Sequence, residues 1–404
     1  MAPDRFDAEH DPVPDRPTTG WSTVDDAIAD AGAVGFVAVG GRFDATLRYL
    51  TRFEGPEREY AVVRAAGTSV LCAPHGYVTR AERQFDGRIA TERVGDPAGE
   101  RAAAVLDDLG GNPTGSAAAT VLVPPTIPHD AAVYLERAGY DPRSTAAVAE
   151  TRATKSAAEI DAIRAVQRAA AAAVERVERL LAAADVDGGI LTDDGGPLTT
   201  ERLRRAANAE LATGGVADAG NTLVYGGRGG RGAPGVGGVD PTGSDPQLEA
   251  GDPVAVAVAP CGPHGYHGCL ARTFVVDSDG GWERRAYVAV ESALDAGLAE
   301  VEAGAVAAAV GREAHAELAA FGFEPGAEAG VDGPAAPGHG VGLSRRERPW
   351  LDAGAELEAG NVVAVGPAVT DPERGTVRLS ALVVVTEDGS ERLGDGEWSF
   401  APRA

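Results

Sequence analysis

Three arginines lie within four residues, at Arg345, Arg346 and Arg348, in a chain whose formal net charge is −25. A guanidinium group presents a planar fork of N–H donors that matches a carboxylate or a phosphate. The spacing therefore predicts a site for a small anion, and Glu347 and Arg272 are further candidate ligand-binding residues. The competing interpretation is a solvated cationic loop that pairs with nearby acidic side chains such as Glu347.

A second set of residues could support thiol or zinc chemistry. His267 and Cys269 are two positions apart on a predicted strand, so their side chains should face the same side. Together with His339 they would form a Cys/His₂ set, which could bind Zn²⁺ or lower the pKa of the thiol. We favour the simpler interpretation, in which the pair is incidental and Cys269 is a small buried apolar residue.

The elements that must position these residues are visible as apolar patterns. Two β-branched runs, 254–259 and 270–276, are joined by a Gly/Pro/His-rich turn and predict a hairpin of buried strands. Ser156 and Glu159 form a capping-box pattern at the start of a helical stripe that continues to about residue 184. Further helices are predicted at 24–31, 130–138, 201–212, 282–301 and 306–321, and further strands at 34–39, 61–63, 69–73 and 121–123.

Several of these segments resemble the creatinase / Xaa-Pro peptidase / methionine aminopeptidase family, whose catalytic fold is called pita-bread. The hairpin carries Gly251-Asp252, Gly265-Tyr266 and Arg272-Thr273-Phe274 of the family pattern, and residues 151–160 resemble the entry to the pita-bread domain. Residues 47–55 resemble the Y-L-T-G-F-x-G segment of the N-terminal domain, with Arg52 in place of its glycine. The resemblance implies an α+β fold with a disordered acidic tail (1–20), a small α/β creatinase-like domain (21–150) and a pita-bread domain (151–404).

The same resemblance locates the family's metal ligands. Relatives hold two divalent ions with two Asp, one His and two Glu, which activate a water and polarise the scissile carbonyl. The matching positions here are Ala257 (or a residue within one or two positions of it), Cys269, His339, Gly366 and Ser380. Arg346 stands where relatives carry a substrate-contacting histidine. One histidine cannot hold a pair of hard divalent ions, so no metal cofactor is expected, with zinc at Cys269, His267 and His339 as the alternative.

Three functions follow from this comparison. The leading one is a non-catalytic relative of Xaa-Pro peptidases with a binding or assembly role, which holds a small anion or carboxylate ligand in the former active-site cleft. The alternative is a hydrolase with a remodelled, metal-free or Cys/His site, and the third is an ordinary metallopeptidase, which the ligand losses contradict. His339 is the one candidate catalytic residue, although we favour the simpler interpretation of a turn histidine between glycines. The metal-free route of creatinase is not supported, because its glutamate corresponds to Ala271.

Composition sets the remaining expectations. The high acidity and the single lysine, Lys155, indicate a halophilic protein whose surface charges are screened by salt. The same charge argues against nucleic-acid and anionic-membrane partners. Three cysteines, no recognisable signal peptide and no apolar stretch of about 18 residues predict a soluble cytoplasmic protein with reduced thiols. Residues 226–238, of which eight of thirteen are glycine, predict a flexible loop. The family resemblance implies a homo-oligomer with a small-molecule or peptide ligand.

Overall fold

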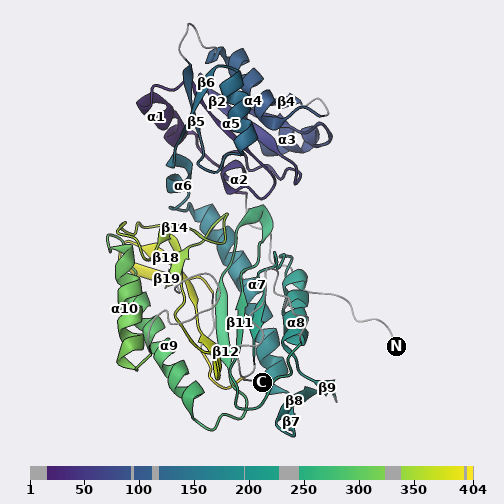
Figure 1. Cartoon of the computed structure of the whole chain (residues 1–404), viewed down its shortest axis with the longest axis vertical. Helices are drawn as coiled ribbons and strands as arrows, with labels where there is room; N and C mark the ends of the chain where they lie inside the picture. The colour runs from purple at the N-terminus through teal and green to yellow at the C-terminus, as the bar shows by residue number, and fades with distance from the viewer. Residues whose placement is uncertain are drawn as a thin grey trace. The chain divides into compact units, whose positions relative to one another are not determined.

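The computed structural model describes residues 16–91, 95–111, 118–194, 196–226, 245–323, 338–394 and 398–403. These described residues fall into two compact units, an N-terminal unit of residues 16–152 and a C-terminal unit of residues 153–404 (Figure 1). The division lies two residues after the domain boundary expected from the sequence. In the described part of the chain, no helix is both long and apolar enough to span a bilayer.

The N-terminal unit is built on one six-stranded sheet in the order β4-β3-β2-β1-β5-β6. The β1–β2 and β2–β3 pairs are antiparallel, whereas the β3–β4, β1–β5 and β5–β6 pairs are parallel. Side chains alternate along a strand, and both faces of this sheet are covered by helices, so its central strands are apolar throughout. The strands are β1 (Gly35–Gly40), β2 (Tyr60–Ala65), β3 (Thr68–Ala73), β4 (Arg88–Thr91), β5 (Ala119–Val123) and β6 (Tyr140–Ser144).

Two hydrophobic cores lie on the two faces of this sheet. Val37 and Val39 of β1 pack in the core that includes α4 (Ala98–Leu106) and α5 (His129–Arg137). Phe36 and Ala38 point to the opposite core. That core takes in the remaining helices, α1 (Ser22–Asp30), α2 (Ala45–Thr51), α3 (Val78–Gln84) and α6 (Ala147–Thr151). The α/β layers predicted for this part of the chain are therefore confirmed.

Residues 47–51 of the segment that resembles the family's N-terminal domain end α2, and Arg52 caps this helix with a φ of 51°, a conformation that favours glycine. One expectation for this unit needs correction. Residues 16–20 are packed rather than part of a disordered tail. Pro17 is buried, and Thr19 Oγ1 donates a hydrogen bond to Tyr49 O (2.6 Å) and accepts one from Arg52 Nε (2.7 Å). The rest of the predicted tail lies outside the described residues.

The C-terminal unit places two pairs of helices on either side of central strands, as Figure 1 shows. The helices α7 (Ala157–Ala182) and α8 (Thr200–Thr213) pack with the β10–β11–β12 sheet in one core. The helices α9 (Trp282–Ala299) and α10 (Ala307–Ala320) pack with β15 and β18 in the other. The predicted capping box is present, because Ser156 Oγ accepts from Glu159 N and the Glu159 carboxylate accepts from Ser156 N. This is the pita-bread arrangement expected from the sequence.

Among its described residues, the strands of this unit form four small sheets. The predicted hairpin is observed as β11 (Val254–Val258) and β12 (Leu270–Phe274), with β10 (Leu223–Tyr225) beside β11. A five-stranded sheet has the order β14-β13-β15-β18-β19, and β16 pairs with β17. The remaining strands are β7 (Asp185–Asp187), β8 (Ile190–Asp193), β9 (Gly196–Pro197), β13 (Gly338–Gly340), β14 (Glu347–Trp350), β15 (Val362–Val365), β16 (Ala368–Asp371), β17 (Gly375–Arg378), β18 (Ala381–Thr386) and β19 (Gly389–Arg392). Nearly all of the predicted glycine-rich loop, from residue 227 onward, lies outside the described residues.

Candidate functional site

The register of the hairpin determines which residues share a face. Ala257 lies opposite Ala271, and Val258 lies opposite Leu270. Since directly paired residues face the same side and side chains alternate, Ala257 lies on the face of Ala271, whereas Val258 faces the opposite side. The two immediate neighbours of Ala257, Val256 and Val258, therefore face away from Ala271. The Gln167 amide fixes Cys269 just before β12, because it accepts from Cys269 N (2.9 Å) and donates to Cys269 O (3.1 Å).

Ser380 adjoins this face of the hairpin. Ser380 N donates to Ala271 O (3.0 Å), which places the residue after β17 against β12. Gly366 lies beside it, since a Cβ atom added to Gly366 would sit 3.1 Å from Ser380 Cβ and 3.8 Å from Arg378 Nη2. Ser380 Oγ is buried, and its hydrogen bond with Cys269 lowers the pKa of that thiol against the larger effect of burial. The two positions that hold glutamates in relatives are therefore neighbours, but here they offer one neutral hydroxyl.

His339 is buried on β13, with 7% of its surface exposed. Its Nδ1 lies 3.0 Å from Gly340 O, and since a carbonyl can only accept, Nδ1 carries the proton. Nε2 is then the acceptor of the neutral ring. Burial is the largest cause of a low pKa for His339, about 4, and Arg346, Arg378 and Arg345 lower the pKa further against the opposing effect of the Gly340 hydrogen bond. The imidazole is therefore neutral at neutral pH.

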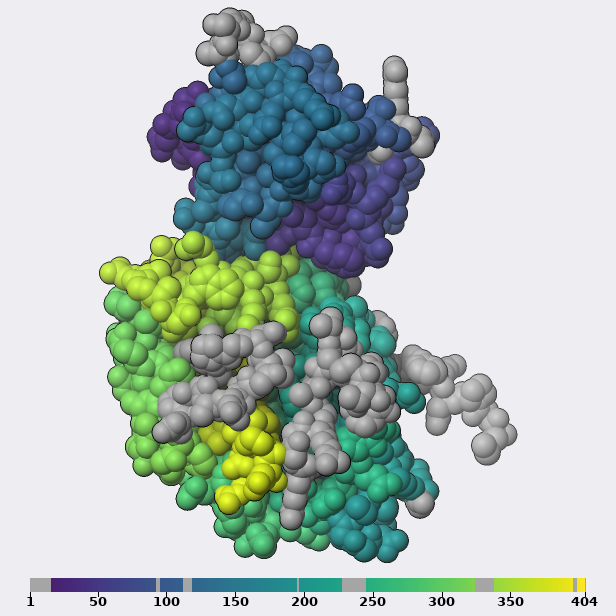
Figure 2. All heavy atoms as spheres, viewed as in Figure 1, coloured from purple at the N-terminus to yellow at the C-terminus, as the bar shows by residue number. Residues whose placement is uncertain are grey.

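The same three arginines act on Cys269. Burial raises the pKa of the Cys269 thiol, while Arg378, Arg345 and Arg346 partly oppose that effect. The thiol is held in its protonated form, because the desolvation cost outweighs the favourable charges. We refer to His339, Cys269 and Ser380 with these three arginines as the cationic site. Arg345 and Arg346 are exposed, and the yellow-green residues around position 350 form part of the visible surface of the C-terminal unit in Figure 2.

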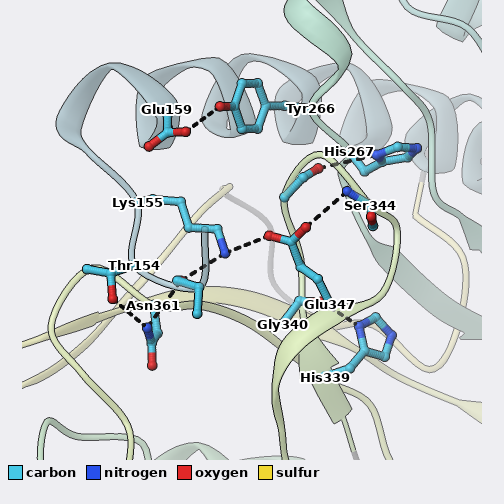
Figure 3. A network of polar contacts seen from close by, with 12 residues as sticks. Thr154, Lys155, Glu159, Tyr266, His267, His339, Gly340, Ser344, Glu347 and Asn361 are labelled. Carbon is cyan, nitrogen blue, oxygen red and sulfur yellow. Dashed lines mark hydrogen bonds and ion pairs between the residues drawn. The ribbon is translucent and has the colours of Figure 1, made fainter. Parts of the chain in front are cut away.

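A buried ion pair supports the loop that carries Arg345 and Arg346. Lys155 Nζ lies 3.0 Å from Glu347 Oε1, and the two side chains are 1% and 7% exposed. Glu347 Oε2 also accepts from Ser344 N (3.1 Å), so one carboxylate ties the loop to the entry of α7 (Figure 3). Gly342 leaves space for this carboxylate, because a Cβ there would lie 2.2 Å from Glu347 Oε1. Glu347 is therefore a structural anchor of the loop rather than a ligand-binding group.

Three residues predicted for the site lie elsewhere. His267 precedes β12 instead of lying on it, and its Nδ1 donates to Gly342 O (3.2 Å; Figure 3). Arg272 points to the other face of the hairpin, where its guanidinium stacks 4.1 Å from the Trp398 ring and donates to Ser380 O. Arg348 is exposed on β14 and is not among the largest charge effects on His339 or Cys269. The prediction that His267 and Cys269 lie on one strand and face the same side was wrong, because the strand begins only at Leu270.

Arg378 is the member of the cationic site that the sequence reasoning missed. It lies two residues before Ser380, at the end of β17. Because side chains two apart on an extended segment face the same side, the identification of Ser380 as a site position should have drawn attention to it. Arg378 Nε is buried without a hydrogen-bond partner in the described part of the chain.

Comparison with known proteins identifies the family. The sequence profile of metallopeptidase family M24 matches residues 161–387, more than half of the chain. The chain belongs to this family. The probable dipeptidase PepE of Mycobacterium bovis is 31% identical over 149 residues, which cover 36% of this chain and 38% of that protein. The Xaa-Pro dipeptidase of Pyrococcus furiosus is 30% identical over 152 residues, which cover 37% of this chain and 42% of the relative. These sequence matches therefore span less than half the length of the relatives.

A solved structure extends the fold similarity of this M24 protein to nearly the whole chain. The prolidase from Pyrococcus horikoshii OT3 superposes with a TM-score of 0.77 and covers 94% of this chain and 99% of its own. Its sequence identity is 17%, so this similarity concerns the fold alone. The family resemblance inferred from the motifs is confirmed by the profile match, and the superposition confirms the expected fold.

The residues of this M24 chain do not fit the dinuclear metal centre expected of the family. Ala257 and Gly366 have no donor atom, Ser380 offers a neutral hydroxyl, and the Cys269 thiol is protonated. Hard divalent ions prefer several carboxylate or carbonyl oxygens, and the nearby arginines would repel them. Within the described ranges, no group of three or more His, Cys, Asp or Glu side chains is placed to hold a metal ion, and this includes Cys269, His267 and His339.

Metal analysis provides a direct check of this misfit. After incubation with Mn²⁺, Co²⁺ or Zn²⁺ and exhaustive dialysis, we expect the purified M24 chain to retain far less metal than the roughly two ions of a dinuclear site. Inductively coupled plasma mass spectrometry measures the ratio. A retained content near two ions per chain would contradict the expectation, and a chain first stripped with a chelator serves as the baseline.

Proposed function

We propose that this M24 protein binds a small carboxylate-bearing ligand at the cationic site and does not hydrolyse it by a metal-dependent route. The observations that carry the proposal are the charges of Arg345, Arg346 and Arg378, which lower the pKa of both His339 and Cys269, and the buried Arg378 Nε, which has no hydrogen-bond partner in the described residues. Fixed cations attract an anion and disfavour a divalent cation at the same place. The chain as a whole has a formal net charge of −25, so a local group of three arginines differs in sign from the rest of the protein.

The donors of the site match the acceptors of a carboxylate. A guanidinium can give a carboxylate two parallel N–H···O bonds, which are stronger than bonds between neutral groups. Arg378 Nε is buried and lacks a hydrogen-bond partner within the described residues. A buried polar group that remains unpaired destabilises a protein, so a bound oxygen that accepted from this group would be favoured. His339 Nε2 adds an acceptor for an N–H or O–H of the ligand.

The same residues are poorly suited to activate a water. A general base works best with a pKa near the operating pH, whereas His339 has a pKa of about 4. The hydrolase alternative with a Cys/His site needs a thiolate, and burial raises the pKa of Cys269 instead. Binding without turnover is therefore the function that these groups support best.

The relatives indicate which carboxylate to test first. The Pyrococcus furiosus protein is named an Xaa-Pro dipeptidase, and a dipeptide of this kind ends in a carboxylate. We propose that the chain retains affinity for such a dipeptide, or for a smaller carboxylate that uses the same arginines.

Isothermal titration calorimetry with alanyl-proline, acetate and inorganic phosphate tests the proposal. We expect the dipeptide to bind and to remain intact by chromatography. Replacing Arg346 with alanine should weaken binding by about tenfold or more, since a charge-assisted hydrogen bond contributes about 1.5–3 kcal/mol.

The chain supplies a matched control for this experiment. Arg348 has the same charge and lies two residues away, but it is not among the largest charge effects on His339. Arg348→Ala should therefore leave the affinity unchanged. Absence of binding, or equal weakening by the two variants, would contradict the proposed ligand. Release of free proline would instead favour the hydrolase alternative.

A further inference from the structure

The N-terminal unit contains a cavity of about 850 Å³ that has no part in the cationic site. It is formed by the segment before α1, the end of α2, the β2–β3 turn and the segment that joins α3 to β4, all between Arg16 and Arg88. Its volume falls within the range of about 300–1,000 Å³ that is typical of small-molecule sites. Size alone therefore permits a metabolite-sized ligand.

The lining of this cavity is strongly basic in an acidic protein. It includes one acidic side chain, Asp86, and five arginines. The arginines are Arg16, Arg52, Arg64, Arg83 and Arg88. Hydroxyl groups of Thr18, Thr19, Thr68 and Ser69 supply further hydrogen-bonding capacity. Most of the charge on the chain is negative, so this accumulation of arginine is not explained by composition.

Part of this positive charge already has partners. Arg64 forms an ion pair with Asp25 (2.6 Å), and Arg52 Nε donates to Thr19 Oγ1. In contrast, the side chains of Arg16 and Arg88 make no hydrogen bond or ion pair within the described residues. Two arginines that line one cavity are thus available to a ligand.

Several positively charged side chains lie close together around this cavity. Burial is the largest cause that lowers the pKa of Arg16, and the Arg52 guanidinium lowers it further, whereas Glu54 and Asp86 oppose these effects. A bound anion would relieve the repulsion between Arg16 and Arg52 and would give the guanidinium of Arg16 the acceptor that it lacks.

We propose that the N-terminal unit binds a small multivalent anion, a phosphate ester or a polycarboxylate, in this cavity through Arg16 and Arg88. Several guanidinium groups around one cavity suit a ligand that carries more than one negative charge. The site is distinct from the cationic site, and the proposal does not depend on the function of the C-terminal unit.

Calorimetry of the full chain with pyrophosphate and with citrate tests the proposal, and the two ligands distinguish a phosphate from a polycarboxylate source. The titrations are made at constant ionic strength in the Arg346→Ala background, which weakens anion binding by the cationic site. We expect one anion to bind per chain. Arg88→Gln and Arg16→Gln should each weaken binding by about tenfold, the effect of losing one charge-assisted hydrogen bond.

Arg143→Gln is the matched control, because Arg143 is an exposed arginine of the same unit that pairs with Asp141 outside the cavity. It should leave the affinity unchanged. Arg88 is exposed, so its replacement should not impair folding, and circular dichroism verifies this for each variant. The proposal is overturned if neither anion binds, if Arg143→Gln weakens binding as much as Arg88→Gln, or if both cavity variants retain full affinity.

Discussion

Replacing Lys155 with methionine is expected to lower the free energy of unfolding by about 3–5 kcal/mol, because it leaves the Glu347 carboxylate buried without its counter-charge. The pair joins the entry of α7 to the loop after β13, and its side chains are only 1% and 7% exposed. Urea denaturation followed by tryptophan fluorescence measures the change. Three of the four tryptophans, Trp282, Trp350 and Trp398, lie in the C-terminal unit and report its unfolding.

A double-mutant cycle separates the ion pair from simple packing. Glu347→Leu alone should be similarly destabilising, whereas Lys155→Met combined with Glu347→Leu should recover most of the loss, since a buried pair can be replaced by apolar groups at little cost. Arg179→Met provides the control, because the Arg179–Glu175 pair on α7 is half exposed and should contribute no more than about 0.5 kcal/mol. Additive effects of the two single changes would show that Lys155 and Glu347 do not act as a pair.

Replacing Gly340 with alanine is expected to destabilise the C-terminal unit by about 3 kcal/mol, the upper part of the range for overpacking. A Cβ atom at Gly340 would lie 2.1 Å from Arg348 O and 2.4 Å from Arg348 C, so the clash is with the backbone of β14 and not with a mobile side chain. The same urea titration measures the change, and loss of ligand binding should accompany it because His339 is the preceding residue on β13.

Gly354 supplies the comparison for this variant. It lies between β14 and β15, and an added Cβ would have no atom within 4 Å. Gly354→Ala should change the free energy of unfolding by no more than about 0.5 kcal/mol. If Gly340→Ala were as stable as Gly354→Ala, the close approach of β13 and β14 would not explain the glycine.

The sequence motif around His339 can be understood through these contacts. Gly338, Gly340 and Gly342 each lie where a Cβ would come within 2.2 Å of another atom. For Gly338 and Gly340 that atom belongs to the backbone of a neighbouring strand, and for Gly342 it belongs to the buried Glu347 carboxylate. The glycines therefore serve packing, and they remain necessary whether or not the site binds a metal.

Sequence alone determined the elements whose signals are local. The capping box at Ser156 and Glu159 and the apolar stripe that follows predicted α7, and the β-branched runs around residues 254–276 predicted the hairpin. Hydrogen bonds to neighbouring residues and the period of side-chain burial are properties of short segments, so they can be recognised without a tertiary structure. The family motifs likewise predicted Cys269, His339, Gly366 and Ser380 as site positions by their order along the chain.

The tertiary structure decided which charges meet. Arg378 and Arg346 are 32 positions apart in the sequence, yet both are among the largest charge effects on His339, whereas Arg348, only two residues from Arg346, is not. Arg272 faces Trp398 because it alternates along β12 with Ala271, which pairs with Ala257, and a shift of one residue moves a side chain to the other face of a sheet. Electrostatic energy depends on distance in space and on burial, neither of which sequence separation specifies, so only the folded chain showed that arginines gather around the buried histidine.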